Sequence, residues 1–219
     1  MKIINKMKKI FTIILCLIAL SIKAEFISAT LYFNDGSKKV GFSQLVGTED
    51  NKVKFKVTLD SEKEKIPSDD LKKIEFKDSK NNLYVCERLK VWSINILKYK
   101  YFEKKRWLYQ LGTENNYSVY VESTFTTFIR TNSYSYPNFG ESFFYYRYKK
   151  DEIAYLGFAQ SDAGVSIVIF RKKEIKNMIN EMFGGKCNLD QEIEKIKFDR
   201  KSGKDPFKVL DILIKSNCK

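Results

Sequence analysis

The sequence predicts an α+β fold: an antiparallel β-sheet or SH3-like partial barrel, then a β meander, then a C-terminal three-helix tail. Between residues 26 and 159, short segments alternate apolar with polar residues and are separated by turn-forming residues, which is typical of strands. From residue 171 onward, apolar residues recur at the period of a helix. The expected regions are a signal peptide at 1–24, a small SH3-like β region at 25–92, an antiparallel β meander at 93–170 and a helical region at 171–219.

The first 24 residues have the layout of a secretory signal peptide. Four lysines precede an apolar run of about 13 residues from Ile10 to Ile22, and Ala24 offers a small residue at a cleavage point. A membrane-spanning helix needs roughly 20 apolar residues, so a cleaved signal is favoured over an anchor. The bulky Leu15 before Cys16 disfavours a lipoprotein signal. We therefore expect a mature chain without a transmembrane span, exported to the periplasm or the extracellular space after cleavage near Ala24.

The first β region is expected to begin with a hairpin, because Asp35 and Gly36 lie between two apolar segments and glycine adopts the positive φ that such turns need. The alternating segment 52–59 predicts a half-buried strand whose buried face holds Val53, Phe55, Val57 and Leu59. Pro67 and the residues after it mark a tight turn or one helical turn. The acidic pair Asp69 and Asp70 in that turn could hold a cation or act as acid and base, but helix capping explains it better.

The second β region is expected to form longer strands at 106–111, 117–125 and 142–150. In 142–150 the alternation predicts one buried aromatic face, formed by Phe144, Tyr146 and Tyr148, and a second face that becomes polar along its length. The loop before this strand contains Pro137, Asn138 and Gly140 and also carries aromatic residues. The rings of Tyr134, Tyr136 and Phe139 in this loop could form a contact surface, or the loop could fold over and cover one end of the sheet.

Three short amphipathic helices are expected in the tail. Apolar residues recur at helical spacing in 171–185, and Gly184 is placed to end that helix. The pattern repeats in 188–198, and Asp205 with Pro206 predicts the start of the last helix. Methionine and phenylalanine stripes at this spacing are typical of a core.

Three cysteines remain after the expected cleavage, and an oxidising compartment favours one disulfide. Cys187 follows the end of a predicted helix and Cys218 lies near the last residue, so a Cys187–Cys218 bridge would fix the last two helices. Cys86 lies in a predicted strand and is expected to pack as a small apolar group. Three free thiols, or pairing of Cys187 between chains, remain the alternatives.

Two segments, "YYRYKKDEIAYLGF" at 145–158 and "MFGGKCNLDQEIEKIKF" at 182–198, together with "ATLYFNDGSKKVGF" at 29–42, resemble a group of uncharacterised exported proteins of Bacteroidota. The order of elements in the first region also resembles the SH3-like half-barrels of exported bacterial proteins. These resemblances imply export and a layout of strands followed by helices. They imply no activity.

The sequence contains no histidine, which excludes Ser-His-Asp and Cys-His nucleophile systems and His-ligated zinc. No phosphate-binding glycine loop, nucleophile elbow or calcium loop is present, so we predict no catalytic residue, no cofactor and no metal ligand. Cleavage of the signal would lower the formal net charge from +13 to +8. The basic clusters at 101–106 and 170–176 are therefore expected to be solvated faces, and a nucleic-acid partner is disfavoured.

Two function classes remain. The first is a non-catalytic cell-envelope or secreted interaction module that binds a protein, a glycan or a lipid surface through its aromatic loop. The second is a hydrolase that acts on an envelope or extracellular polymer with carboxylates alone. No residue pattern selects a carboxylate pair, so the binding module is favoured.

Overall fold

The computed structural model describes residues 26–95, 98–122, 128–130, 135–137, 141–149, 151–161, 168–198, 205–216 and 218. The expected signal peptide lies outside these residues. The strands are β1 Ile27–Phe33, β2 Lys38–Ser43, β3 Lys52–Lys56, β4 Glu64–Pro67, β5 Leu71–Lys77, β6 Leu83–Asn95, β7 Lys98–Glu114, β8 Tyr117–Glu122, β9 Phe128–Arg130, β10 Ser135–Pro137, β11 Glu141–Tyr148 and β12 Ile153–Ser161. The helices are the 3₁₀ turn η1 Ser68–Asp70, α2 Val168–Met182, α3 Asp190–Glu194 and α4 Asp205–Lys215.

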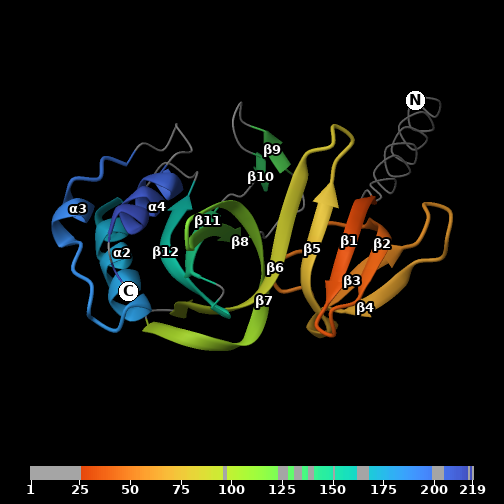
Figure 1. The fold of residues 1–219 in the computed structure, drawn as a ribbon, viewed down its shortest axis with the longest axis horizontal. Helices are drawn as coiled ribbons and strands as arrows, with labels where there is room; N and C mark the ends of the chain where they lie inside the picture. Colours follow the sequence, from red (N-terminus) through yellow and green to blue (C-terminus); the bar gives the residue numbers. More distant parts are fainter. Residues whose placement is uncertain are drawn as a thin grey trace, which may run out of the picture.

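Ten of the strands form one continuous sheet in the order β12-β11-β8-β7-β6-β5-β1-β2-β3-β4. The sheet closes on itself because β12 also pairs with β6, in parallel, through Ile153 and Lys90, Ala154 and Val91. Strands β6, β7, β8, β11 and β12 thus form a five-stranded barrel, and β1–β5 extend from its β6 side (Figure 1). The α+β order predicted from the sequence is confirmed, with the α-helices following the strands.

The predicted hairpin at the start of the chain is confirmed. Strands β1 and β2 pair antiparallel around a turn in which Gly36 has a φ of 90°. Strand β1 also pairs with β5, which in turn pairs with β6. The expected boundary between the two β regions, at residues 92 and 93, lies inside β6. The division into domains therefore stays a prediction.

The prediction for 52–59 was partly wrong. Val53 and Phe55 are fully buried in β3, but the strand ends at Lys56. Val57 and Leu59 are about half exposed, at 50% and 53%. The following residues form the connection to β4, in which the Ser61 amide donates to the Thr58 carbonyl at 3.1 Å. The turn overrides the alternation because β3 must reverse direction to pair with β4.

The prediction of one buried face for 142–150 was also incomplete. Phe144 and Tyr146 are buried as expected, but Tyr145 on the other face is fully buried too. Closure of the barrel explains this, since residues from all five strands that face its interior form a second apolar cluster: Leu89, Val91, Leu108, Tyr120, Tyr145, Ala154 and Leu156. The barrel is filled by these side chains, as expected for so few strands.

Glycine allows one close approach in the barrel wall. The pairing of β11 with β12 shifts register between Phe144 and Tyr145, opposite Gly157. A Cβ atom at Gly157 would overlap the ring of Tyr146. The hydroxyl of Tyr146 holds the ring in place, because it donates a hydrogen bond to the Pro206 carbonyl at 2.9 Å. Tyr146 thus links the barrel wall to α4.

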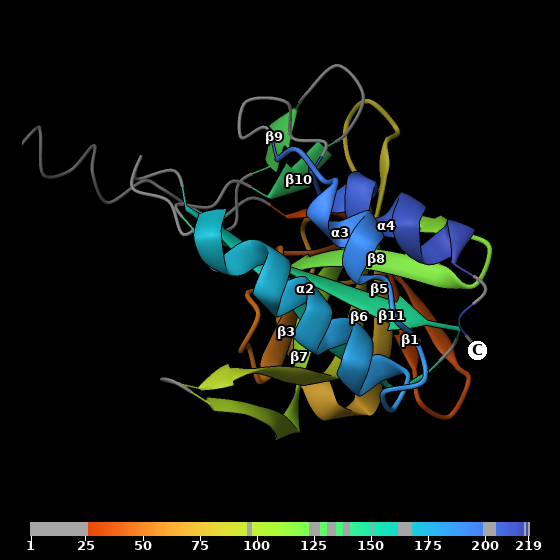
Figure 2. The same ribbon diagram turned by 90° about the vertical axis from the view of Figure 1, so that its left-hand side faces the viewer.

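The helices lie together on one side of the barrel, beside β12 and β8 (Figures 1 and 2). Helix α2 packs on β12, and α4 packs on β8. The predicted stripe of α2 is buried at Ile175, Met178 and Ile179. The tail was expected to have a solvated basic cluster at 170–176, and this was wrong for Arg171, which is 1% exposed and donates to Asp205 Oδ2 at 3.2 Å.

Candidate functional site

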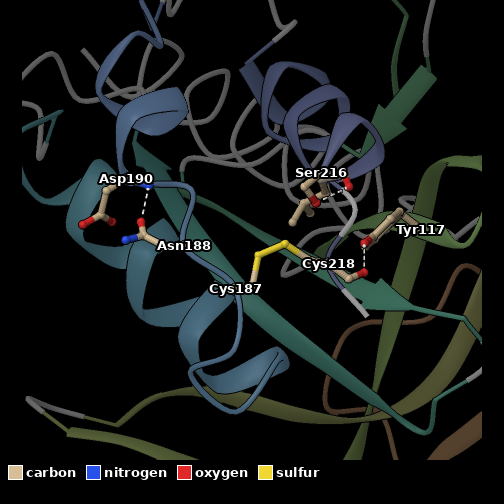
Figure 3. The surroundings of a disulfide bond; sticks show 7 residues. Tyr117, Cys187, Asn188, Asp190, Ser216 and Cys218 are labelled. Atoms are coloured by element: carbon tan, nitrogen blue, oxygen red, sulfur yellow. Dashed lines mark hydrogen bonds between the residues drawn. A yellow bond between two sulfur atoms is a disulfide. The ribbon is translucent and has the colours of Figure 1, made fainter.

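The predicted Cys187–Cys218 disulfide is present, with the two Cα atoms 5.5 Å apart. It joins the segment after α2 to the chain after α4 (Figure 3). The Tyr117 hydroxyl points at the Cys218 carbonyl, at 3.5 Å. Cys86 is a free, buried thiol, as expected, and burial raises its pKa well above the usual range. The bridge thus links the chain that follows α2 to the chain that follows α4, next to β8.

The loop predicted before the 142–150 strand was wrong at residues 135–137, which form strand β10, and the contact surface assigned to its three rings is not tested by the structure. Tyr134 and Phe139 lie outside the described residues. The backbone of Tyr136 pairs with Ile129 in the small β9–β10 hairpin, but its side chain also lies outside the described part. The contact surface proposed for these three rings stays a prediction.

A basic cleft of about 440 Å³ lies where the barrel meets the sheet of β1–β5. Ten residues line it, contributed by both halves of the chain: Asn34, Lys72, Lys73, Glu87, Arg88, Leu89, Lys105, Arg147, Asp151 and Glu152. Five of them are cationic and three are carboxylates, so the cleft has a formal surplus of two positive charges. Its volume is in the range of small-ligand pockets.

Arg88 is the most deeply buried cation of this cleft. Its side chain is only 1% exposed, and its guanidinium lies over the ring of Trp107 at 5.5 Å. Nη2 donates to Asp69 Oδ1 at 3.1 Å. Nε and Nη1 are buried and have no hydrogen-bond partner among the described residues. A buried charged group with unsatisfied donors costs stability, of order 1–3 kcal/mol, and attracts any acceptor that reaches it.

Asp69 belongs to the short turn η1, which is fixed by its neighbour Ser68. Ser68 Oγ donates to the Asp50 carbonyl at 2.7 Å and accepts from Trp107 Nε1 at 3.1 Å. The tight turn or single helical turn predicted after Pro67 is present as the 3₁₀ turn η1, but the capping role expected for the acidic pair was wrong. No side chain caps this turn, and Asp69 instead reaches across to Arg88.

Glu87 and Arg147 form a second ion pair in the cleft. Arg147 Nη1 donates to Glu87 Oε2 at 2.7 Å, and Nη2 donates to Oε1 at 3.2 Å. The hydroxyl of the buried Tyr120 donates to the same Oε1 at 3.1 Å. Both Glu87 oxygens are therefore occupied, and this bidentate geometry fixes the Arg147 guanidinium in the lining of the cleft.

A second cluster of hydrogen-bonded polar side chains contains Ser93, which follows Glu87 by six positions along β6. This cluster therefore lies further along the barrel than the Glu87–Arg147 pair. Glu122 accepts from Tyr145 at 2.7 Å and from Arg106 at 3.0 Å. Burial raises the pKa of the Glu122 carboxyl, while both hydrogen bonds act in the opposite direction. Ser93 Oγ lies 3.1 Å from the Tyr145 hydroxyl. Each of these polar side chains has a hydrogen-bond partner. The cluster therefore compensates the buried Glu122 carboxylate and offers no vacant donor to a ligand.

The cleft is suited to binding anions. Lys105 forms no ion pair with any described residue, and Arg88 has donors to spare. Asp151 and Glu152 are exposed at the turn between β11 and β12. Within the described ranges, no group of three acidic or cysteine side chains comes together that could hold a metal ion. None of the helices in the described part of the chain has the length and hydropathy to cross a membrane.

The residues of this cleft were not predicted from the sequence. Lys105 and Arg106 were assigned to a solvated basic face, and this was wrong for Arg106, which binds Glu122 and Glu49. Arg88 carried a usable signal, because it follows Tyr84 and Cys86 at every second position and so shares the buried face of its strand. A cation at an inward-facing strand position needs a partner, and that requirement marks it as unusual.

Comparison with protein-family models, with curated proteins and with solved structures finds no match for this chain. The geometry of the cleft is therefore the basis for assigning a function.

Proposed function

We propose that the protein is an exported, non-catalytic binding module that takes an anionic ligand in the basic cleft. One observation carries the proposal: Arg88, whose side chain is 1% exposed, lines the cleft and has two buried nitrogens without a partner in the described chain. An anion at this position would supply acceptors that the protein lacks. The surrounding cations from β5, β7 and β11 would attract it from solution.

The cleft favours binding over catalysis. General acid–base hydrolysis by carboxylates needs two carboxyl groups that face the substrate, one of which holds a proton at working pH. Glu87 has both oxygens engaged by Arg147 and Tyr120. Asp151 and Glu152 are exposed at a turn. No carboxyl group of the described cleft is therefore both buried and free, as the general acid of such a hydrolase would need to be.

Calorimetric titration tests the proposal. We expect inorganic pyrophosphate and phosphate to bind the wild-type chain at low ionic strength, with affinity falling as salt screens the cleft. Lys105→Gln should weaken binding, because it removes an unpaired cation of the cleft. Lys54→Gln is the matched control: it removes one positive charge from the exposed face of β3, outside the cleft. No binding to the wild type, or equal losses in both variants, would contradict the proposal.

Export has a separate test. The basic n-region and short apolar run support a signal peptide, and the disulfide is consistent with an oxidising compartment. N-terminal sequencing of the mature protein should begin near Glu25. A soluble cytoplasmic protein that retains Met1 would contradict this part of the proposal.

A further inference from the structure

An exposed carboxylate holds a buried cation at the cleft. The Asp69 side chain is 80% exposed, whereas the Arg88 side chain that it binds is 1% exposed. Their contact is a single hydrogen bond of 3.1 Å to one carboxylate oxygen, Oδ1. Ion pairs with an exposed partner are weak when solvent competes for that partner.

The backbone at Asp69 is fixed without help from this ion pair. Its carbonyl accepts from Asn34 Nδ2 at 2.6 Å, and the next carbonyl, of Asp70, accepts from the Asn34 amide at 2.9 Å. Ser68 anchors the turn from the other side. The Asp69 side chain can therefore rotate into solvent while η1 stays in place.

From these contacts, and on the basis of the proposed function, we infer that Asp69 occupies Arg88 as an internal competitor, and that the ligand is a phosphoryl group which displaces the Asp69 carboxylate. Asp69 satisfies one of the three guanidinium nitrogens of Arg88. A phosphate ester presents three acceptor oxygens and up to two negative charges, so it satisfies more of these donors than a carboxylate bound through one oxygen. Lys105 and Lys72 line the same cleft and balance the second charge.

The prediction that separates this inference from the proposed function concerns Asp69→Asn. The substitution removes the competing charge, so pyrophosphate should bind roughly two- to fivefold more tightly than to the wild type, the range expected for one exposed ion pair. Asp70→Asn is the matched control, because it removes the same charge from the next residue of the turn, whose side chain forms no ion pair or hydrogen bond with Arg88 in the described structure. We expect a smaller gain for Asp70→Asn.

The outcomes are distinct. Tighter binding by Asp69→Asn than by Asp70→Asn supports the inference. Equal gains in both variants overturn it, because general electrostatics then explains the effect. Unchanged or weaker binding by Asp69→Asn, with binding by the wild type, overturns the inference and leaves the proposed function intact. Absence of binding in the wild type and in Asp69→Asn overturns both. Thermal unfolding of each variant checks that the fold is retained.

Two probes then distinguish the source of the phosphoryl group. Glycerol phosphate represents a soluble phosphorylated ligand, and vesicles of phosphatidylcholine containing phosphatidic acid represent a lipid headgroup. The inference requires that Asp69→Asn strengthens binding of at least one probe. Weaker or unchanged binding of both probes by Asp69→Asn overturns it, as does stronger binding of acetate than of phosphate by the wild type.

Discussion

Removal of the Cys187–Cys218 bridge should lower the free energy of unfolding, by an amount set by the length of chain that the bridge closes. The two cysteines are 31 residues apart, so the bridge closes a loop of that size in the unfolded chain. The loop-entropy relation then gives a contribution of about 3.7 kcal/mol at 25 °C. For a domain of this size, such a loss corresponds to a fall in Tm of roughly 7–15 °C. The bridge also attaches the chain after α4 near Tyr117, so the loss should begin there.

The assay compares the wild type, with and without reductant, with the double variant Cys187→Ser/Cys218→Ser. Calorimetric unfolding should show that reduced wild type and the double variant have the same lowered Tm, and that reductant has no effect on the variant. Amide hydrogen exchange should show faster opening in α4, which begins at Asp205, than in β6. The buried Cys86 contributes no bridge and serves as an internal control for reductant.

A Tm that is unchanged by reduction, or full alkylation of both cysteines in the oxidised protein, would show that the bridge does not constrain the chain. Protection lost equally across the barrel and the helices would contradict the local role assigned to the bridge.

Three further perturbations follow from the fold. Gly157→Ala should destabilise by about 1–3 kcal/mol in denaturant unfolding, because its Cβ would overlap the Tyr146 ring. Asp205→Asn should cost about 3–5 kcal/mol, since it leaves the buried Arg171 without its carboxylate. Stability should fall between pH 10 and pH 12 in alkaline titration, because burial raises the pKa of Tyr99 from 10.0 to about 12 and the unfolded chain therefore loses that proton first.

Matched measurements control these perturbations. Gly47→Ala should change stability by less than about 0.5 kcal/mol, because its Cβ would make only ordinary contacts with Asp50 at 3.6 Å. Asp211→Asn, on the exposed side of α4, should likewise be near neutral. If either control variant lowers the free energy of unfolding as much as the variant it is matched to, packing and burial do not explain the losses.

The alkaline prediction is checked by following tyrosine ionisation through ultraviolet absorbance. Ionisation in the folded protein should need a higher pH than ionisation of free tyrosine. If the two titration curves coincide, the alkaline prediction is wrong.

Several features of the fold could be predicted because they are local. Glycine at positive φ defines the first hairpin, apolar spacing defines α2, and Asp205 with Pro206 marks the start of α4. The disulfide could be predicted because the helical tail holds two cysteines close to its helix ends.

Closure of the barrel could not be predicted in this way. The parallel pairing of β12 with β6 joins residues about 60 positions apart, and no local pattern specifies it. Closure in turn buries both faces of β8 and β11, which is why Tyr145 was not recognised as a core residue. The cleft escaped prediction for the same reason, since its cations come from strands that only the closed barrel and the adjoining sheet bring together.

Arginine side-chain NMR tests the central claim, that Arg88 is the anion-binding group of the cleft, most directly. The Arg88 Nε–H resonance, assigned by its loss in Arg88→Lys, should move downfield and saturate as pyrophosphate is added, because Nε gains the acceptor that it lacks in the free protein. The Arg171 resonance should stay in place, because that side chain is buried with Asp205 away from the cleft. An unchanged Arg88 resonance at saturating pyrophosphate would contradict the account.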